Sequence, residues 1–175
     1  MAGLSSESIR AALGPKAAVV RVMPNMPARI GAGISALCLG AGATEDDLAV
    51  PMALMQSVGE VVRVTEEQMY AVTATSGSGP AFVLRMAEAM EGAAIAEGLE
   101  PATARTLVQQ TLFGTAKLMI ETGDDPATLR AAVTSKGGTT AAGLDAMSAA
   151  GFDDAVVAAI HAATARGIEL GHENS

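Results

Sequence analysis

One stretch divides this sequence into two parts with different local patterns. Residues 71–85 read AVTATSGSGPAFVLR, with two Gly-Ser alternations, a proline and the start of a long apolar run. Before this stretch, short alternating segments are typical of strands, and after it the strong patterns have the period of a helix. Chemistry that uses both parts of the chain is therefore expected to lie near this stretch.

The first part predicts short strands separated by turns and capped helices. Two prolines, Pro24 and Pro27, cannot donate to a strand ladder, so a turn is expected directly after the first strand. Strands are expected over 17–23, 30–39 and 60–64, and helices starting at Ser5 or Ser6, at Thr44 and at 65–67. The second part predicts helices over 79–97, 101–123, 125–133, 139–151 and 153–170, with Asp153 as the cap of the last one.

The helix expected over 79–97 constrains the assembly, because its apolar residues lie on more than one face. A helix that is apolar nearly all round must be buried. The chain has 175 residues, of which only three are Phe, one is Tyr and none is Trp, so small and aliphatic side chains must fill its core. A second copy that covers the helices is the favoured prediction, an obligate homodimer. The alternative is a compact monomeric bundle with these helices at its centre.

Charge and composition exclude several classes of function. The net charge of −8 argues against binding to nucleic acid or to an anionic membrane, since both need a cationic surface. No apolar run has the length of about 20 residues that spans a bilayer, and the N-terminus lacks the pattern of a signal peptide. The single cysteine, Cys38, lies in an apolar run without a nearby histidine, so a buried core thiol and a reduced cytoplasmic setting are expected.

Residues 135–140, reading SKGGTT, are the main candidate for a binding site. The paired glycines let successive N–H groups turn toward one point, and the start of the following helix adds partial positive charge. The hydroxyl groups of this segment and Lys136 add further donors. These features predict a site for a small anion, although a plain helix cap with a flexible lead-in explains the same composition.

Other patterns are rejected on their context. Residues 31–36, reading GAGISA, match a dinucleotide fingerprint, but extended residues rather than a helix are expected to follow. The TSGSG at 75–79 lacks the first glycine of a nucleophile elbow, and the Ser135-Lys136 pair is too close in sequence for a dyad. Two isolated histidines and one cysteine predict no metal site. Thr73 precedes the glycines and, on its own pattern, is as easily a packing residue.

Three segments, taken together, carry a resemblance to a known family. They are RVMPNMP at 21–27, AVTATSGSGPAF at 71–82 and VTSKGGTTAAGL at 133–144. In this order and spacing they resemble pyrroline-5-carboxylate reductase over nearly the whole chain. The resemblance implies an N-terminal Rossmann domain followed by a helical domain that interleaves with its partner in a dimer. Many members assemble further into rings of dimers.

The resemblance also implies an activity and a set of site residues. The family transfers hydride from NADPH, or from NADH, to the C=N carbon of a small anionic imine, 1-pyrroline-5-carboxylate, giving L-proline. By position, Met23, Pro24 and Asn25 would lie beside the nicotinamide, and Thr73 would contact the ring nitrogen and help to supply its proton. The substrate carboxylate would be held by Ser135, Gly137, Gly138, Thr139 and Thr140.

The sequence departs from the family in its first part. The glycine-rich fingerprint and first strands of the family have no counterpart before residue 21. Lys136 stands where the family usually has proline, and Met26 where it has threonine. We therefore expect a mainly α chain: an α/β remnant of a Rossmann-type cofactor domain over 1–65, then an all-helical dimerisation and substrate-binding domain over 66–175. Weak NADPH binding is expected for this chain, which alone is expected to be inactive or impaired, and the alternative is a non-catalytic helical dimerisation module.

Overall fold

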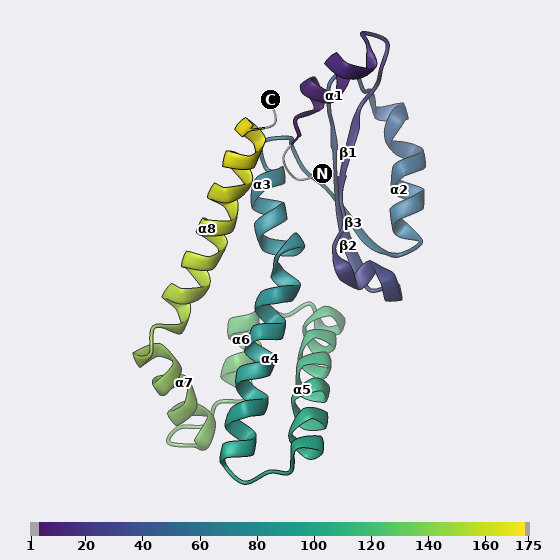
Figure 1. Ribbon diagram of the computed structural model, residues 1–175. Coiled ribbons are helices and arrows are strands. Elements are labelled where there is room, and N and C mark those ends of the chain that lie inside the picture. Colours follow the sequence, from purple (N-terminus) through teal and green to yellow (C-terminus); the bar gives the residue numbers. More distant parts are fainter. Residues whose placement is uncertain (1–3, 174–175) are drawn as a thin grey trace. The chain divides into compact units, whose positions relative to one another are not determined.

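The computed structural model describes residues 4–173, so residues 1–3 and 174–175 of the two expected domains lie outside the described part. The chain is mainly helical, with a small three-stranded sheet near its N-terminus, which confirms the expected fold class (Figure 1). It divides into two compact units. Unit 1 contains the residues up to Ala81 and those from Val157 onward, and unit 2 contains Phe82–Val156.

Unit 1 holds all the strands of the described residues and the helices between them. In chain order its elements are α1 (Ser6–Leu13), β1 (Val20–Met23), the 3₁₀ helix η1 (Met26–Ile30), β2 (Gly33–Leu39), the 3₁₀ helix η2 (Glu45–Leu48), α2 (Ala49–Gln56), β3 (Gly59–Arg63) and α3 (Met69–Val72). Two predicted caps are present. The Ser5 hydroxyl accepts the Ser8 N–H at 3.1 Å, and Thr44 and Asp47 form a reciprocal capping box.

The sheet is mixed, in the order β1-β2-β3. Strand β1 runs antiparallel to β2, with Arg21 opposite Cys38 and Met23 opposite Ala36, while β2 and β3 are parallel. Because opposite residues share a face, Arg21, Met23, Ala36 and Cys38 all lie on one side of the sheet. The first strand is shorter than the expected 17–23, and α3 begins at Met69, a few residues after the expected start.

The core of unit 1 forms where α3 packs on that face of the sheet. Ala36, Cys38 and Met69 are buried, and Met23, Val64 and Val72 pack around them. On the other face α2 contacts β2 and β3. The end of α8 (Phe152–Glu173) adds a further layer on α3, because the Tyr70 ring fills a notch left by Gly167 and Gly171.

The Gly-Ser stretch is helical rather than a loop. A π turn, η3 (Thr73–Gly77), follows α3 directly, and α4 (Gly79–Ala96) follows the π turn. Its widened pattern is seen in the bond from the Ser78 N–H to the Thr73 carbonyl, five residues back, at 2.8 Å. The expected junction is therefore a π turn within one helical run, a local irregularity that occurs often at functional sites.

Unit 2 is built from helices whose limits follow the expected ones closely. It contains most of α4, then α5 (Pro101–Thr122), α6 (Pro126–Ala132), α7 (Thr139–Ala149) and the start of α8. The expected cap of the last helix is wrong. Gly151 takes a left-handed conformation with φ of 73°, which separates α7 from α8, so α8 begins at Phe152 and Asp153 lies inside its first turn.

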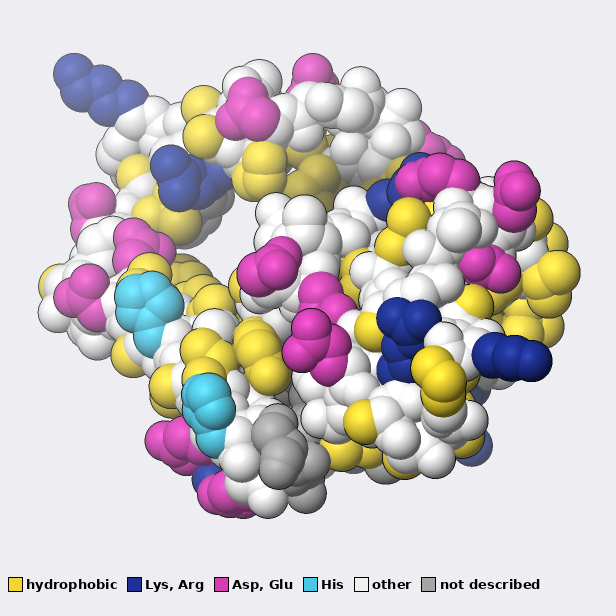
Figure 2. Space-filling model, turned by 90° about the horizontal axis from the view of Figure 1, so that it is seen from above, with side chains coloured by type: hydrophobic (Ala, Val, Ile, Leu, Met, Phe, Trp, Pro, Cys, Tyr) yellow, Lys and Arg dark blue, Asp and Glu magenta, His cyan; other side chains and the backbone are white. Residues whose placement is uncertain are grey.

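Unit 2 leaves much apolar surface open. Among its described residues the buried apolar side chains are only Ala104 and Val108, both on α5. Leu107, Phe113 and Ile120 on α5 are examples of its exposed apolar side chains. Over the face of the molecule seen in Figure 2, apolar side chains lie on the surface among Asp and Glu side chains. None of the helices between residues 4 and 173 combines the length and apolar character that a membrane crossing needs.

Candidate functional site

The three residues predicted to lie beside a nicotinamide form the turn after β1. Met23 ends the strand, and Pro24 has no N–H to continue the ladder. The Asn25 side-chain oxygen accepts the Ile34 N–H at 3.0 Å, which fixes the turn to the start of β2. The turn is thus held at both ends, and its carbonyl groups and the Asn25 amide nitrogen are the groups it offers to a ligand.

Thr73 lies at the start of the π turn and is partly buried. Its hydroxyl donates to the Met69 carbonyl, one turn back, at 2.8 Å. With its proton used in this way, the Thr73 oxygen is available as an acceptor toward a positively charged N–H group. Ser76 makes the same kind of bond, to the Val72 carbonyl at 3.0 Å, so it is not poised as a nucleophile.

Unit 1 brings the predicted turn and the predicted threonine together at Gly77. A Cβ built on Gly77 would lie 2.7 Å from the Met23 methyl carbon and 3.7 Å from Cγ2 of Thr73. With glycine at this position, the Met23 methyl can lie directly against the backbone of the π turn. The end of β1 and the π turn therefore form one continuous surface.

The segment 135–140 lies in unit 2 and forms the start of α7. Gly137 has φ of 71°, and the Gly138 N–H donates to the Ser135 carbonyl at 3.0 Å, closing a turn directly before the helix. Gly138 is the N-cap residue and supplies no side chain, so the first N–H groups of α7 are left for another acceptor.

The hydroxyl groups of this segment have no partner within the described part of the chain. Ser135, Thr139 and Thr140 form no side-chain hydrogen bond there, whereas the neighbouring Thr134 hydroxyl donates to the Arg130 carbonyl at 2.6 Å. Lys136 is exposed and forms no ion pair with another described residue. Free hydroxyls, a cation and a helix start together make an arrangement that suits a carboxylate.

The structure also places the candidates that the sequence analysis rejected. Cys38 is buried, and burial together with the charge of Glu66 raises the pKa of its thiol, so it is a core residue rather than a nucleophile. The GAGISA segment leads into strand β2 and not into a helix, so it cannot present a helix N-terminus to a phosphate. Between residues 4 and 173 no group of three or more His, Cys, Asp or Glu could hold a metal ion.

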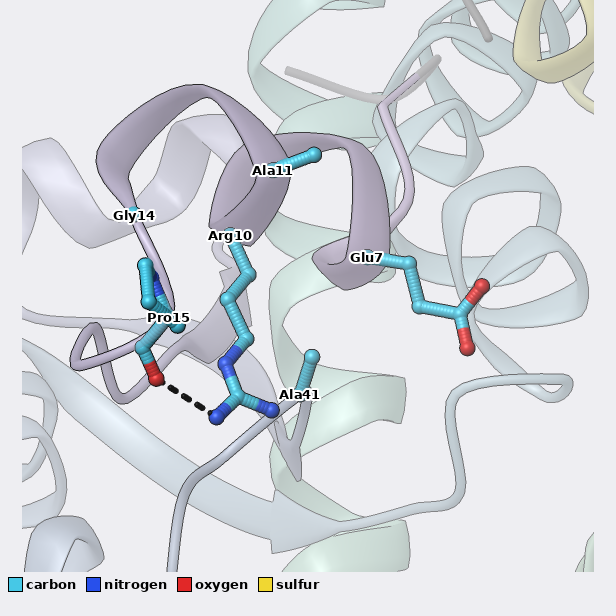
Figure 3. Close-up of a pocket in the computed structure, with 6 residues that line it drawn as sticks. All are labelled: Glu7, Arg10, Ala11, Gly14, Pro15 and Ala41. Carbon is cyan, nitrogen blue, oxygen red and sulfur yellow. Dashed lines mark hydrogen bonds between the residues drawn. The ribbon is translucent and has the colours of Figure 1, made fainter.

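Unit 1 contains two hollows, of which one lies away from the predicted site residues and the other lies next to the π turn. One, of about 490 Å³, is lined by α1 and by Ala41, and it contains none of the predicted site residues. Figure 3 shows the Arg10 guanidinium donating to the Pro15 carbonyl, at 2.7 Å, while the Glu7 carboxylate points away from it. The other, of about 460 Å³, lies between the sheet and the π turn, and Thr75 and Ser76 reach its wall. Neither gathers a set of polar groups around one point.

A family model described as pyrroline-5-carboxylate reductase dimerisation matches residues 66–170. The chain belongs to this family. It is 43% identical over 171 residues to a pyrroline-5-carboxylate reductase of Synechocystis and 39% identical over 170 residues to pyrroline-5-carboxylate reductase 2 of Bacillus subtilis. These alignments cover 98% and 97% of this chain but 64% and 61% of those relatives.

Solved structures of the pyrroline-5-carboxylate reductase family have the same fold. A Coxiella burnetii reductase superposes with a TM-score of 0.91 at 34% identity, over 96% of this chain and 63% of that one. A Plasmodium falciparum reductase with NADP bound superposes with a TM-score of 0.89 at 30% identity, over 97% of this chain and 68% of that one. The family match begins at Glu66, and the boundary expected between residues 65 and 66 stays a prediction.

Sequence reasoning missed a network of polar groups around Glu66. Glu66 was expected only as an acidic residue at a helix start. In the structure its carboxylate accepts hydrogen bonds from the Ser6 N–H at 2.7 Å, the Ser6 hydroxyl at 2.5 Å and Arg21 at 3.1 Å. An acid and a base separated by 45 residues give no local signal, although the burial of a charge on an alternating strand hints that Arg21 needs a partner.

Proposed function

We propose that this chain carries the dimerisation and substrate-binding part of a pyrroline-5-carboxylate reductase, and that the site reduces 1-pyrroline-5-carboxylate to L-proline with NADPH or NADH. The family match over residues 66–170 carries the proposal. The chain spans 55–64% of the length of the curated relatives it matches, so the activity of the whole relatives is extended to it here as a proposal.

The carboxylate of the substrate is assigned to the start of α7. Ser135, Thr139 and Thr140 offer hydroxyl donors that are free within the described residues, and Gly137 and Gly138 let the backbone approach the ligand closely. Lys136 adds charge attraction from an exposed position. Holding the carboxylate fixes which face of the ring, and which carbon, is presented for reduction.

The ring nitrogen is assigned to Thr73. A cyclic imine accepts hydride far more readily when its nitrogen is protonated, so a group that favours the N–H⁺ form assists the reaction. The Thr73 oxygen can accept that N–H because its own proton is bonded to the Met69 carbonyl. This assigns Thr73 to stabilising the protonated imine.

The cofactor is assigned to the turn at Met23, Pro24 and Asn25. The carbonyls and the Asn25 amide of this turn suit a nicotinamide carboxamide, and the Plasmodium falciparum relative has NADP bound. A nicotinamide supplies the hydride in such a reaction. The turn from β2 to η2 carries Gly40 and Gly42 but lacks the third glycine of a phosphate-binding turn, and η2 begins with three acidic residues, so weak cofactor binding remains our expectation.

A homodimer is part of the proposal. The helices of unit 2 keep large apolar side chains exposed, among them Leu107, Phe113 and Ile120 on α5, with 52%, 61% and 79% of their surface open. Surface of this kind is typical of a protein–protein interface. Rings of dimers, and the cytoplasm as the place where the protein acts, complete the proposal and extend from the same family membership.

The test is proline formation and NADPH oxidation by the purified chain supplied with 1-pyrroline-5-carboxylate. We expect Thr73→Val to lower kcat/KM about 100-fold, since it removes the oxygen but keeps the branched shape. The control is Thr106→Val, which removes a similar hydroxyl-to-carbonyl bond of 2.9 Å from α5. Equal rates for the two variants would contradict the assignment of Thr73.

The second candidate is a non-catalytic dimerisation module. The observation that favours it is the open apolar surface of unit 2, which suits association with a second copy whether or not the chain catalyses a reaction. A dimeric, folded chain that forms no proline even at millimolar NADPH would support the module. Micromolar NADPH affinity would contradict our expectation of weak binding.

A further inference from the structure

The Ser6–Arg21–Glu66 network joins three segments of unit 1 that are distant in sequence. Glu66 lies just before α3, Arg21 lies on β1, and Ser6 begins α1. The Ser6 hydroxyl also accepts the Ala41 N–H at 2.9 Å, so the network reaches the loop after β2 as well. Ser6 is 1% exposed, and the Arg21 and Glu66 side chains are 11% and 28% exposed. Sheltered charges of this kind are costly to leave unpaired.

The network lies at one end of the contact between α3 and the sheet, and the predicted cofactor turn lies at the other. Arg21 and Met23 are on the same face of β1, two residues apart. Between these ends, Met69 packs on Ala36 and Cys38. At the far end, the Met23 methyl rests on Gly77, inside the π turn that contains Thr73. The helical run is thus attached to β1 at two points, by ions at its start and by a methyl–glycine contact at its π turn.

We propose that Arg21 and Glu66 are positioning residues that hold the Met23–Asn25 turn against the Thr73–Gly77 turn. The proposal rests on the proposed function, which places the nicotinamide at the first turn and the imine nitrogen at the second. Hydride transfer requires the two reactants at a fixed distance and angle, so a pair that sets the spacing of the two turns affects the reaction without touching either reactant. Burial alone raises the pKa of Glu66, but the bonds from Ser6 and the charge of Arg21 more than offset this and hold its pKa below the usual value, so the pair is ionised at neutral pH.

Amide hydrogen exchange of the chain as it stands tests the proposal without any ligand. Two amides report on the two turns: the Ile34 N–H bonds to the Asn25 side chain, and the Ser78 N–H bonds to the Thr73 carbonyl. In Glu66→Gln we expect the protection of both amides to fall about tenfold, with the amides of α5 unchanged. Arg21→Met is expected to do the same, and Arg21→Lys to restore most of the protection.

The control is Glu45→Gln, which breaks the exposed Arg63–Glu45 pair of the same unit, 2.7 Å long, and should leave both amides unchanged. Loss of protection confined to α1, or equal loss across the chain, would overturn the proposal, because a purely structural network gives one of these results. If Glu66→Gln fails to fold, comparing the protection of the two amides in Arg21→Lys and in Arg21→Met tests the same point.

A kinetic arm separates this inference from the proposed function. If the chain reduces the imine, Glu66→Gln should lower kcat about tenfold with little change in the KM for the imine, because the segment 135–140, which is assigned to the substrate carboxylate, is unchanged. An unchanged kcat beside lost protection would show that the spacing of the turns does not limit the reaction, and would overturn the catalytic part of the proposal. A chain that forms no proline even at millimolar NADPH contradicts the proposed function, while the exchange arm still decides whether Arg21 and Glu66 hold the turns.

Discussion

The two units of this molecule differ in how far they bury their apolar side chains. Unit 1 covers both faces of its sheet, with α3 on Ala36 and Cys38 and with α2 on the other side, and it buries Leu37 completely. Unit 2 is longer in helix but buries little, and α5 exposes apolar side chains along its length. Unit 1 therefore has a core of its own. Unit 2 has enough apolar residues for a core, but in a single copy most of them stay exposed.

Several glycines of the two units differ in how closely other atoms surround them. In unit 1 a methyl group added at Gly33, Gly59 or Gly77 would meet backbone or side-chain atoms, whereas at Gly92, Gly114 and Gly143, inside the helices of unit 2, it would meet nothing within 4 Å. Tight packing in unit 1 fixes relative positions, which suits a site that needs geometry. Open helices in unit 2 suit association with a second copy.

The largest effect is expected from a charge on the open face of α5. In Phe113→Glu the new carboxylate would be buried unpaired in the proposed dimer, so we expect the dimer to dissociate and unit 2 to lose its fold. Light scattering after size exclusion should then give the mass of one chain, 17.5 kDa, instead of twice that mass. Helical circular dichroism should fall with it.

The control for this substitution is Gln110→Glu, which adds the same charge to the same helix at an exposed polar position. It should remain dimeric. A Phe113→Glu protein that stays dimeric, or a wild-type chain that is monomeric and stably folded, would remove the contrast between the two units.

A smaller but clear loss is expected from Gly59→Ala in unit 1. Gly59 has φ of 150°, and a Cβ there would meet the backbone of Gly33 on the paired strand, with the carbonyl carbon at 2.6 Å. The strain should cost about 2 kcal/mol or more, which lowers the melting temperature by about 5 °C in a chain of this size.

Gly92→Ala is the matched substitution in unit 2. It lies inside α4 with open space around it, and alanine is a better helix former than glycine. We expect unchanged or slightly raised stability. A loss as large as that of Gly59→Ala would show that Gly92 is also closely packed, most simply against the second copy.

The elements of both units could largely be predicted because their signals are local. Proline at the first turn of α5 and α6, the Thr44 capping box and the alternation at β3 depend on a few neighbouring residues. The π turn was not predicted, because the residues at 73–77 carry no local signal that distinguishes a π turn from an ordinary helical turn. Asp153 misled because an acidic residue favours both the cap and the first turn of a helix.

The residues of the candidate site likewise differ in whether a local sequence signal predicts them. The segment 135–140 is a continuous stretch whose glycines and hydroxyls indicate an anion site by themselves, and its geometry fits that reading. Thr73 and Met23 have weak local signals, and only the fold places both at Gly77. For the Arg21–Glu66 pair, the sequence hints only that Arg21 needs a partner, and the partner is identified by the fold, which brings the two residues together.

The smallest effect is the pH dependence of the stability that carboxylates contribute in the two units. The pKa of Glu66 is lowered on folding, so its contribution to stability is present above the ordinary Glu pKa of about 4.3 and is lost as the pH falls through the lower folded pKa. Wild type should therefore melt higher than Glu66→Gln at pH 7, by about 2–4 °C, and the difference should shrink toward zero as the pH falls below 4.

Glu88→Gln serves as the comparison from unit 2. The Arg85–Glu88 pair lies on α4 with 83% and 67% of its side chains open, so water and salt screen it. Its variant should melt within about 1 °C of wild type at every pH. A Glu66→Gln difference that stayed constant with pH would mean that the loss comes from packing and not from charge, and the contrast between a sheltered ion network in unit 1 and exposed pairs in unit 2 would then not extend to energetics.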